Sequence, residues 1–187
     1  MWGFGFMLRR FFTVSSNDDI PPPPINSDYL MSLGQLTQGY RALDTQLFGV
    51  AVKVFDISML AALAIFGGGD PKRTLGVISR YLNETYRNPN HEAYQGWKGI
   101  EKKVESLISK RNEIIHSIEI DRSGEAIQFL RFASTKPVYQ RGQYSYHTAF
   151  SEYTPRSIAK LSHDFHTCCN EMRDWLGVYQ SKPPSSP

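Results

Sequence analysis

Apolar residues recur every three or four positions along the first half of the chain, which predicts helices that pack one face against neighbouring elements. The pattern runs from Leu33 to Ala64. Three glycines within it lower the helix propensity, namely Gly34, Gly39 and Gly49. The segment therefore forms either one long helix or two helices separated by a kink.

The glycine-rich stretch at 67–71 ends this segment and starts the next helix. Asp70 is placed to cap the helix and Pro71 to occupy its first position. The apolar face of this short helix is expected at Leu75, Ile78 and Leu82. A third helical segment is expected from about Asn90 to Ser117, because apolar residues again follow helical spacing there.

The pattern changes after this third segment. Residues 117–132 alternate between apolar and polar on both sides of Asp-Arg-Ser-Gly, which predicts a β-hairpin. Residues 134–153 are polar and rich in tyrosine, and we expect a loop. A last helix then begins with Thr154 as its cap and Pro155 in its first position. Its apolar positions are Ile158, Leu161, Phe165, Cys168, Met172, Leu176 and Tyr179.

These elements predict a mainly all-α fold, an up-and-down helical bundle of about four to five helices with a small β-hairpin before the last helix. The helical domain is expected to span 27–180. Residues 1–26 are expected to form a flexible N-terminal tail, with a spacer of consecutive prolines at 21–24. Residues 181–187 have the composition of a disordered C-terminal tail.

Composition narrows the class of protein only a little. A hydrophobic content of 41% and a charged content of 21% are typical of globular proteins, and the net charge of +3 permits a nucleic-acid partner without requiring one. The adjacent Cys168 and Cys169 exclude a disulfide framework, so we expect a reducing compartment and a cytoplasmic protein. The apolar run at 50–66 contains Lys53 and Asp56 and is shorter than the roughly 20 residues that span a bilayer, which favours a buried helix and no membrane.

The first 16 residues are aromatic and contain Arg9 and Arg10 but no acidic residue. In a secretory signal the charges precede the apolar stretch, whereas here they follow it. An extended tail or a mis-assigned start is the first interpretation, and an organelle-targeting or membrane-surface segment is the alternative.

The sequence KRNEIIHS at 110–117 places polar residues at the end of the third helical segment. Helical spacing puts Arg111 in the middle of the apolar stripe, where it needs an acidic partner, a subunit interface or an anionic ligand, because an unpaired buried charge is costly. Asn112 and His116 lie together on the flank of the stripe, with Glu105 on the same side. The stripe consists of Trp97, Ile100, Val104, Leu107, Ile108, Ile114, Ile115 and Ile118.

This layout suits the cleavage of RNA without a metal. The guanidinium of Arg111 offers a fixed fork of donors to phosphate oxygens. The imidazole of His116 can accept or donate a proton near neutral pH, and Asn112 can hold the imidazole or the substrate. The competing interpretation is structural, with an arginine that pairs with a carboxylate and a histidine favoured by the helix dipole.

The segment resembles the HEPN superfamily (higher eukaryotes and prokaryotes nucleotide-binding domains), whose motif is Arg, a polar residue, three or more others, then His. Arg111, Asn112 and His116 match that motif. The resemblance implies a helical bundle that dimerises and brings two motifs together across one cleft. Many members are metal-independent endoribonucleases of toxin–antitoxin, phage-defence or RNA-processing systems, often with a separately encoded antitoxin. Others are inactive binding or scaffolding modules.

Spacing alone is weak support, because an arginine followed by a histidine also occurs at Arg141–His147 and Arg156–His163. Two further sites are less well supported. The cluster of histidines and cysteines at 163–169 contains zinc-binding atoms but fits the apolar face of the last helix. The stretch at 67–74 has the glycines of a phosphate loop but lacks its Gly-Lys-Ser/Thr ending.

The sequence thus favours a homodimeric HEPN-type endoribonuclease with no cofactor and no metal, acting on an RNA substrate. Arg111, Asn112 and His116 are the expected catalytic residues. Aromatic and basic side chains at Arg141, Tyr144 and Tyr146 are the expected substrate contacts. The partners are a second copy of the chain and, as a further expectation, a separately encoded antitoxin or other protein. The alternative is the same fold as a non-catalytic scaffold or a nucleotide- or RNA-binding module.

Overall fold

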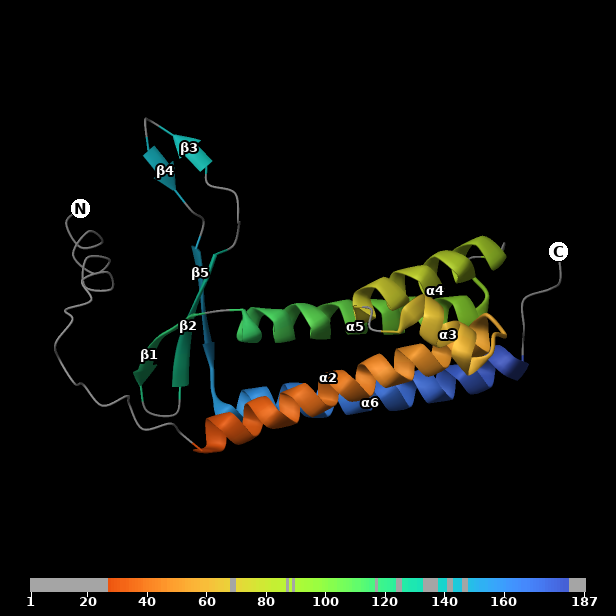
Figure 1. Cartoon of the computed structure of the whole chain (residues 1–187), viewed down its shortest axis with the longest axis horizontal. Helices are drawn as coiled ribbons and strands as arrows, with labels where there is room; N and C mark the ends of the chain where they lie inside the picture. Colours follow the sequence, from red (N-terminus) through yellow and green to blue (C-terminus); the bar gives the residue numbers. More distant parts are fainter. Residues whose placement is uncertain are drawn as a thin grey trace.

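The computed structural model describes residues 27–67, 70–86, 88, 90–116, 118–123, 126–132, 138–140, 143–145 and 148–181. Side chains are described outside 117–150. Within these parts the chain forms five helices, which alternate in direction as an up-and-down bundle (Figure 1). The predicted fold class, a helical bundle, is confirmed.

The first predicted segment is two helices, α2 (Ser27–Val54) and α3 (Met59–Phe66). The break between them contains Asp56, which has a positive φ of 49°, a conformation that ends a helix. Ser58 then caps α3 by accepting a hydrogen bond from the backbone N–H of Ala61 at 3.2 Å. The glycines that suggested a kink all lie inside α2 instead.

The next two helices follow the sequence closely. In α4 (Pro71–Thr85), Asp70 caps the first turn and Pro71 occupies the first position, as predicted. The helix α5 (Glu92–Ile115) is capped by His91, whose Nδ1 accepts from the N–H of Ala93. The expected stripe of α5 is buried as far as Ile114, but Ile115 is 38% exposed.

The last helix, α6 (Pro155–Ser181), begins with a reciprocal cap. The N–H of Ser157 donates to Oγ1 of Thr154 at 3.1 Å, and the N–H of Thr154 donates to Oγ of Ser157 at 2.9 Å. This arrangement satisfies backbone donors at both positions and explains why the helix starts at the predicted residue.

The segment between α5 and α6 contains more strand than the sequence indicated. The expected hairpin is present as β1 (Ile118–Ser123) and β2 (Ala126–Phe132), with Ser123 opposite Ala126. The expectation of a loop over 134–153 is wrong, because β3 (Val138–Gln140) pairs with β4 (Gln143–Ser145), and β5 (Thr148–Tyr153) pairs antiparallel with β2. The sequence did not indicate these strands, because their residues show no regular alternation of apolar and polar positions.

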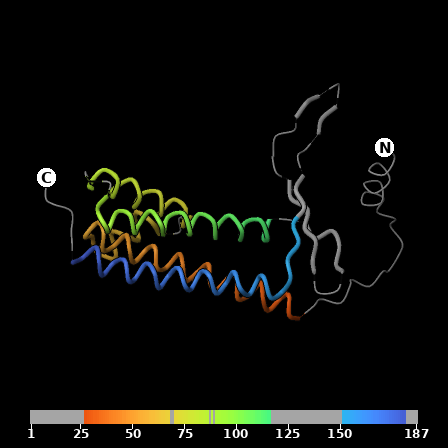
Figure 2. The backbone as a smooth tube through the Cα atoms, turned by 180° about the vertical axis from the view of Figure 1, so that it is seen from behind, coloured from red at the N-terminus to blue at the C-terminus, as the bar shows by residue number. Residues whose placement is uncertain are grey.

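The helices α2 and α6 run side by side in the same direction along the whole bundle (Figures 1 and 2). They approach each other closely at Gly39, where a Cβ atom would lie 3.0 Å from the carbonyl oxygen of Ser162 and 3.2 Å from Cβ of Phe165. Oγ of Ser162 donates to the carbonyl oxygen of Gln35 at 2.7 Å across the same contact. A glycine is thus required by the packing rather than by its backbone conformation.

The apolar run at 50–66 is not the buried helix that we expected. Its first part completes α2, and α3 leaves Met59, Leu60, Leu63 and Ile65 each at least half exposed. Only Ala62 and Phe66 of α3 enter the core. Among the described helices, none is both long and apolar enough to cross a membrane.

Replacing Gly39 by alanine tests this helix contact. We expect Gly39→Ala to lower the free energy of unfolding by about 1–3 kcal/mol, because its methyl group would press on the backbone of α6. Gly34→Ala is the matched control, since no atom lies within 4 Å of the place that its methyl group would take, and it should stabilise α2 by about 0.5–1 kcal/mol. Urea unfolding followed by circular dichroism measures both. Equal effects of the two substitutions would contradict the close approach.

Candidate functional site

Arg111 lies in the last turn of α5 and is half-buried. Its guanidinium carbon is 4.5 Å from the centroid of the Tyr40 ring on α2, which is cation–π geometry. Its Nη1 donates to Oδ1 of the adjacent Asn112 at 3.0 Å. Among the residues that the structure describes, no carboxylate forms an ion pair with Arg111.

These contacts leave most of the guanidinium available. An arginine has five N–H donors, and stacking on a ring uses its face rather than its donors. Within the described part of the chain, Asn112 is the acceptor for one of them. The remaining edge can therefore bind an anion in the bidentate geometry that phosphates favour.

His116 is the residue that ends α5. Its backbone N–H donates to the carbonyl oxygen of Asn112 at 3.0 Å, and its side chain is exposed. Asn112 is thus linked to Arg111 through its side chain and to His116 through its backbone. The structure brings the three predicted catalytic residues together on one helical turn, with the imidazole accessible to a substrate.

The end of α5 is also attached to the sheet. Oγ of Ser151 in β5 donates to a carboxylate oxygen of Glu113. Glu113 lies between Asn112 and His116, so this bond holds the motif turn against the last strand before α6. No pattern in the sequence indicated this link, because the two residues belong to different elements.

Tyr40 is the residue of this site that the sequence did not reveal. Its ring meets the ring of buried Phe165 edge-on, with centroids 6.1 Å apart. Burial raises the pKa of Tyr40, the negative charge of Asp70 raises it further, and Arg111 opposes the shift. The ordinary pKa of a tyrosine already lies well above physiological pH, so the guanidinium contacts a neutral ring and not an anion.

Two carboxylates add negative charge near Tyr40. Burial raises the pKa of Asp44, Arg41 lowers it and Asp70 raises it again. Asp70 is the N-cap of α4, so this negative charge lies where α4 begins beside α2. The charges around the Tyr40 ring are thus mixed. The cation of Arg111 comes from α5, and the carboxylates of Asp44 and Asp70 come from α2 and from the start of α4.

The predicted substrate contacts are not tested. Arg141 and Tyr146 lie outside the described residues. Tyr144 belongs to β4, where it is the partner of Tyr139, and its side chain is not described. Of the other arginine–histidine pairs, the pair at 141 and 147 also lies outside the described residues, and the pair formed by Arg156 and His163 is exposed on α6.

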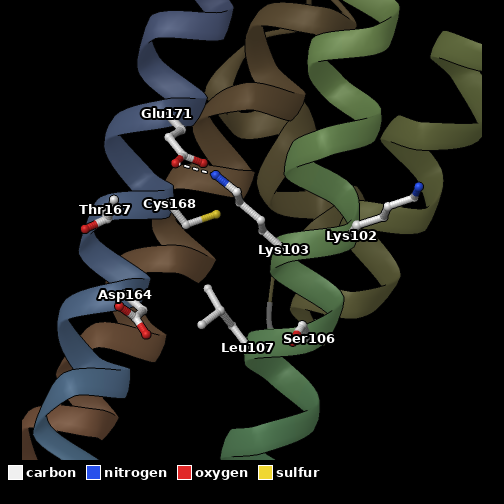
Figure 3. Close-up of a pocket in the computed structure, with 8 residues that line it drawn as sticks. All are labelled: Lys102, Lys103, Ser106, Leu107, Asp164, Thr167, Cys168 and Glu171. Atoms are coloured by element: carbon white, nitrogen blue, oxygen red, sulfur yellow. Dashed lines mark hydrogen bonds and ion pairs between the residues drawn. The ribbon is translucent and has the colours of Figure 1, made fainter.

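A groove lies between α5 and α6. It contains two adjoining cavities of about 380 Å³ each, with Lys103 and Glu171 lining both. Figure 3 shows the first, where Nζ of Lys103 and Oε1 of Glu171 form an ion pair across the groove at 2.6 Å. Because these two charges neutralise one another, we expect the groove to bind an anion less favourably than Arg111 does.

Cys168 lines the same groove, and Cys169 is its neighbour. Both thiols are free and buried, and burial raises the pKa of Cys168 to about 12 and also raises that of Cys169. In the described residues no group of three or more histidine, cysteine, aspartate or glutamate side chains is arranged to hold a metal ion. His163 and His166 are exposed, whereas Cys168 and Cys169 are buried. The side chains of the 163–169 cluster therefore do not point to one common metal position.

The raised pKa values predict unreactive cysteines. At pH 8 the thiolate of Cys168 should be on the order of one part in ten thousand, so iodoacetamide should leave the folded protein unmodified over hours. The same reagent should modify both cysteines once urea has unfolded the chain. Intact-mass spectrometry measures the two states, and rapid labelling of the folded protein would contradict the burial.

Arg111, Asn112, His116 and Tyr40 thus form a site in which a stacked guanidinium with open donors lies one turn from an exposed imidazole. This combination can bind a phosphate and move a proton beside it. Compared with protein-family models, curated proteins and solved structures, the chain shows no match.

Proposed function

We propose that the protein is a metal-independent endoribonuclease of HEPN type that acts as a homodimer. The observation that carries the proposal is the half-buried Arg111, which lacks a carboxylate partner among the described residues and adjoins the exposed His116. The helical bundle and the position of the motif at the end of α5 agree with the resemblance. A toxin, defence or RNA-processing role and a cytoplasmic location belong to the same proposal.

The proposed reaction is transfer of the phosphodiester to the 2′-oxygen of the same nucleotide. His116 accepts the proton of the 2′-OH while that oxygen bonds to phosphorus. The bond from phosphorus to the 5′-oxygen breaks, and this leaving oxygen takes a proton from an imidazolium. Arg111 stabilises the negative charge that develops on the phosphoryl oxygens, and Asn112 holds the guanidinium through its Oδ1. The product is a 2′,3′-cyclic phosphate.

One histidine cannot accept and donate a proton in the same step, so a second copy of the motif is part of the proposal. The helix α2 begins at the end of the bundle where α5 ends (Figure 1), and apolar side chains suitable for an interface are exposed there. Leu30 is 52% exposed, Met31 63% and Ile115 38%. A homodimer that covers these side chains would bring its two copies of α5 together at their C-terminal ends. A separately encoded antitoxin or other protein is a further proposed partner.

A non-catalytic HEPN-like scaffold or nucleotide- or RNA-binding module is the second candidate. One observation favours it: within the described residues, no side chain forms a hydrogen bond with the imidazole of His116. A catalytic histidine is usually oriented by such a partner. In this alternative Arg111 binds phosphate or organises an interface, and no proton moves.

Cleavage of RNA by purified protein tests the proposal. Wild-type protein in EDTA should cleave mixed single-stranded and transfer RNA to fragments with 2′,3′-cyclic phosphate ends. His116→Ala should lower the rate by about 10²–10⁴-fold, the usual effect of removing a general acid or base. His163→Ala is the matched control, because His163 is also exposed and also follows an arginine, and it should leave the rate unchanged.

Sedimentation velocity and thermal unfolding accompany the assay, so that loss of activity is separated from loss of the dimer or of the fold. The absence of cleavage by the wild-type protein, with RNA still bound, would support the binding module. Cleavage that persists in His116→Ala would exclude the proposed role of that residue.

A further inference from the structure

The position of Arg111 depends on a series of contacts that begins in the core. Gly39 allows α2 to approach α6 closely enough for the neighbouring Tyr40 to reach the fully buried Phe165. The edge-on contact with Phe165 fixes one side of the Tyr40 ring. Arg111, arriving from α5, covers the ring with its guanidinium carbon 4.5 Å from the centroid.

Contact with the ring restricts the guanidinium. Its central carbon lies over the face of the Tyr40 ring at 4.5 Å from the centroid, which limits how far the group can move away from that face. Since Asn112 holds Nη1 at 3.0 Å, rotation of the group is restricted as well. The remaining donors are therefore presented to a ligand in a fixed direction, which reduces the entropy lost on binding.

We infer that Tyr40 is a positioning residue, which holds the guanidinium of Arg111 ready to bind a phosphate of RNA. The role in RNA binding rests on the proposed function, whereas the positioning itself can be tested without it. The aromatic ring is the required part. The hydroxyl of Tyr40 is dispensable, because the contacts with both Phe165 and Arg111 are made by the ring.

The burial of Tyr40 is consistent with this role. A tyrosine phenol is neutral at physiological pH and burial raises the pKa of Tyr40 further, so the ring contributes its π face and not a phenolate that would form an ion pair with the guanidinium. A phenolate would compete with the phosphate for the same donors. The neutral ring orients Arg111 without neutralising it.

The inference is tested first by NMR of the arginine side chains. The Nε–H proton of Arg111, assigned by its loss in Arg111→Lys, should be shifted upfield by the ring current of Tyr40. Tyr40→Phe should keep this shift, and Tyr40→Leu should abolish it. Tyr81→Leu is the matched control, since Tyr81 is also a partly exposed tyrosine with an aromatic neighbour, Phe55, but belongs to α4.

Binding is tested next with an uncleavable 2′-O-methyl oligoribonucleotide, by fluorescence anisotropy at fixed salt. Tyr40→Leu should raise its Kd about three- to tenfold, while Tyr40→Phe and Tyr81→Leu should keep the wild-type value. In an Arg111→Ala background, Tyr40→Leu should have no further effect, because Tyr40 acts through Arg111. Thermal unfolding of each variant identifies any loss of the fold.

The two measurements distinguish the possible failures. An unchanged Nε–H shift in Tyr40→Leu would overturn the positioning role, whatever the protein binds. A lost shift with an unchanged Kd would show that the orientation of Arg111 does not matter for RNA, which also overturns the inference. A third outcome is that wild-type protein does not bind the oligonucleotide, although the Nε–H shift is kept in Tyr40→Phe and lost in Tyr40→Leu. The proposed function would then be wrong, and the positioning of Arg111 by Tyr40 would remain supported.

Discussion

The close approach of α2 to α6 at Gly39 is the constraint on which the candidate site depends. These two helices form the most extensive helix pair of the bundle, and a Cβ atom at Gly39 would press on Ser162 and Phe165 at 3.0–3.2 Å. The spacing determines how far Tyr40 projects toward α5. The ring of Tyr40 can hold the guanidinium of Arg111 because the ring is itself fixed by its edge-on contact with Phe165.

The stacked arginine also explains how a cation can occupy an apolar stripe. Burying a guanidinium without a partner is costly, and a carboxylate is the usual solution. Here the ring of Tyr40 covers its apolar face and Asn112 accepts one donor. The charge itself is left to attract an anion. The candidate site and the fold are therefore linked. Tyr40 and Asn112 allow Arg111 to lie in the apolar stripe, and the same two residues orient its guanidinium.

Local signals in the sequence predicted the helices well, whereas tertiary contacts did not follow from them. Asp70 and Thr154 cap their helices as expected, because a cap depends on residues within one turn. The place of the break, at Asp56, and the exposure of α3 were missed. The glycines suggested a kink elsewhere, and apolar spacing does not show which face of a helix packs against a neighbour. The motif at 111–116 was recognisable as a pattern. Its supporting residue Tyr40 was not, because the contact forms only in the fold, where α2 and α5 both pack on α6.

The length of α4 has a consequence for the dynamics of the site. The helices α3 and α4 lie at the end of the bundle where α5 begins, and toward the motif only α2, α5 and α6 continue (Figure 1). The half of α5 that carries Arg111 is therefore packed on fewer sides than the half that carries Trp97, which is fully buried and donates to Oγ of Ser79 in α4. Local opening costs least where packing is thinnest, so amide hydrogens should exchange faster around the motif than in the first turns of the same helix. A single helix would then combine a slowly exchanging first half with a C-terminal half that opens more readily.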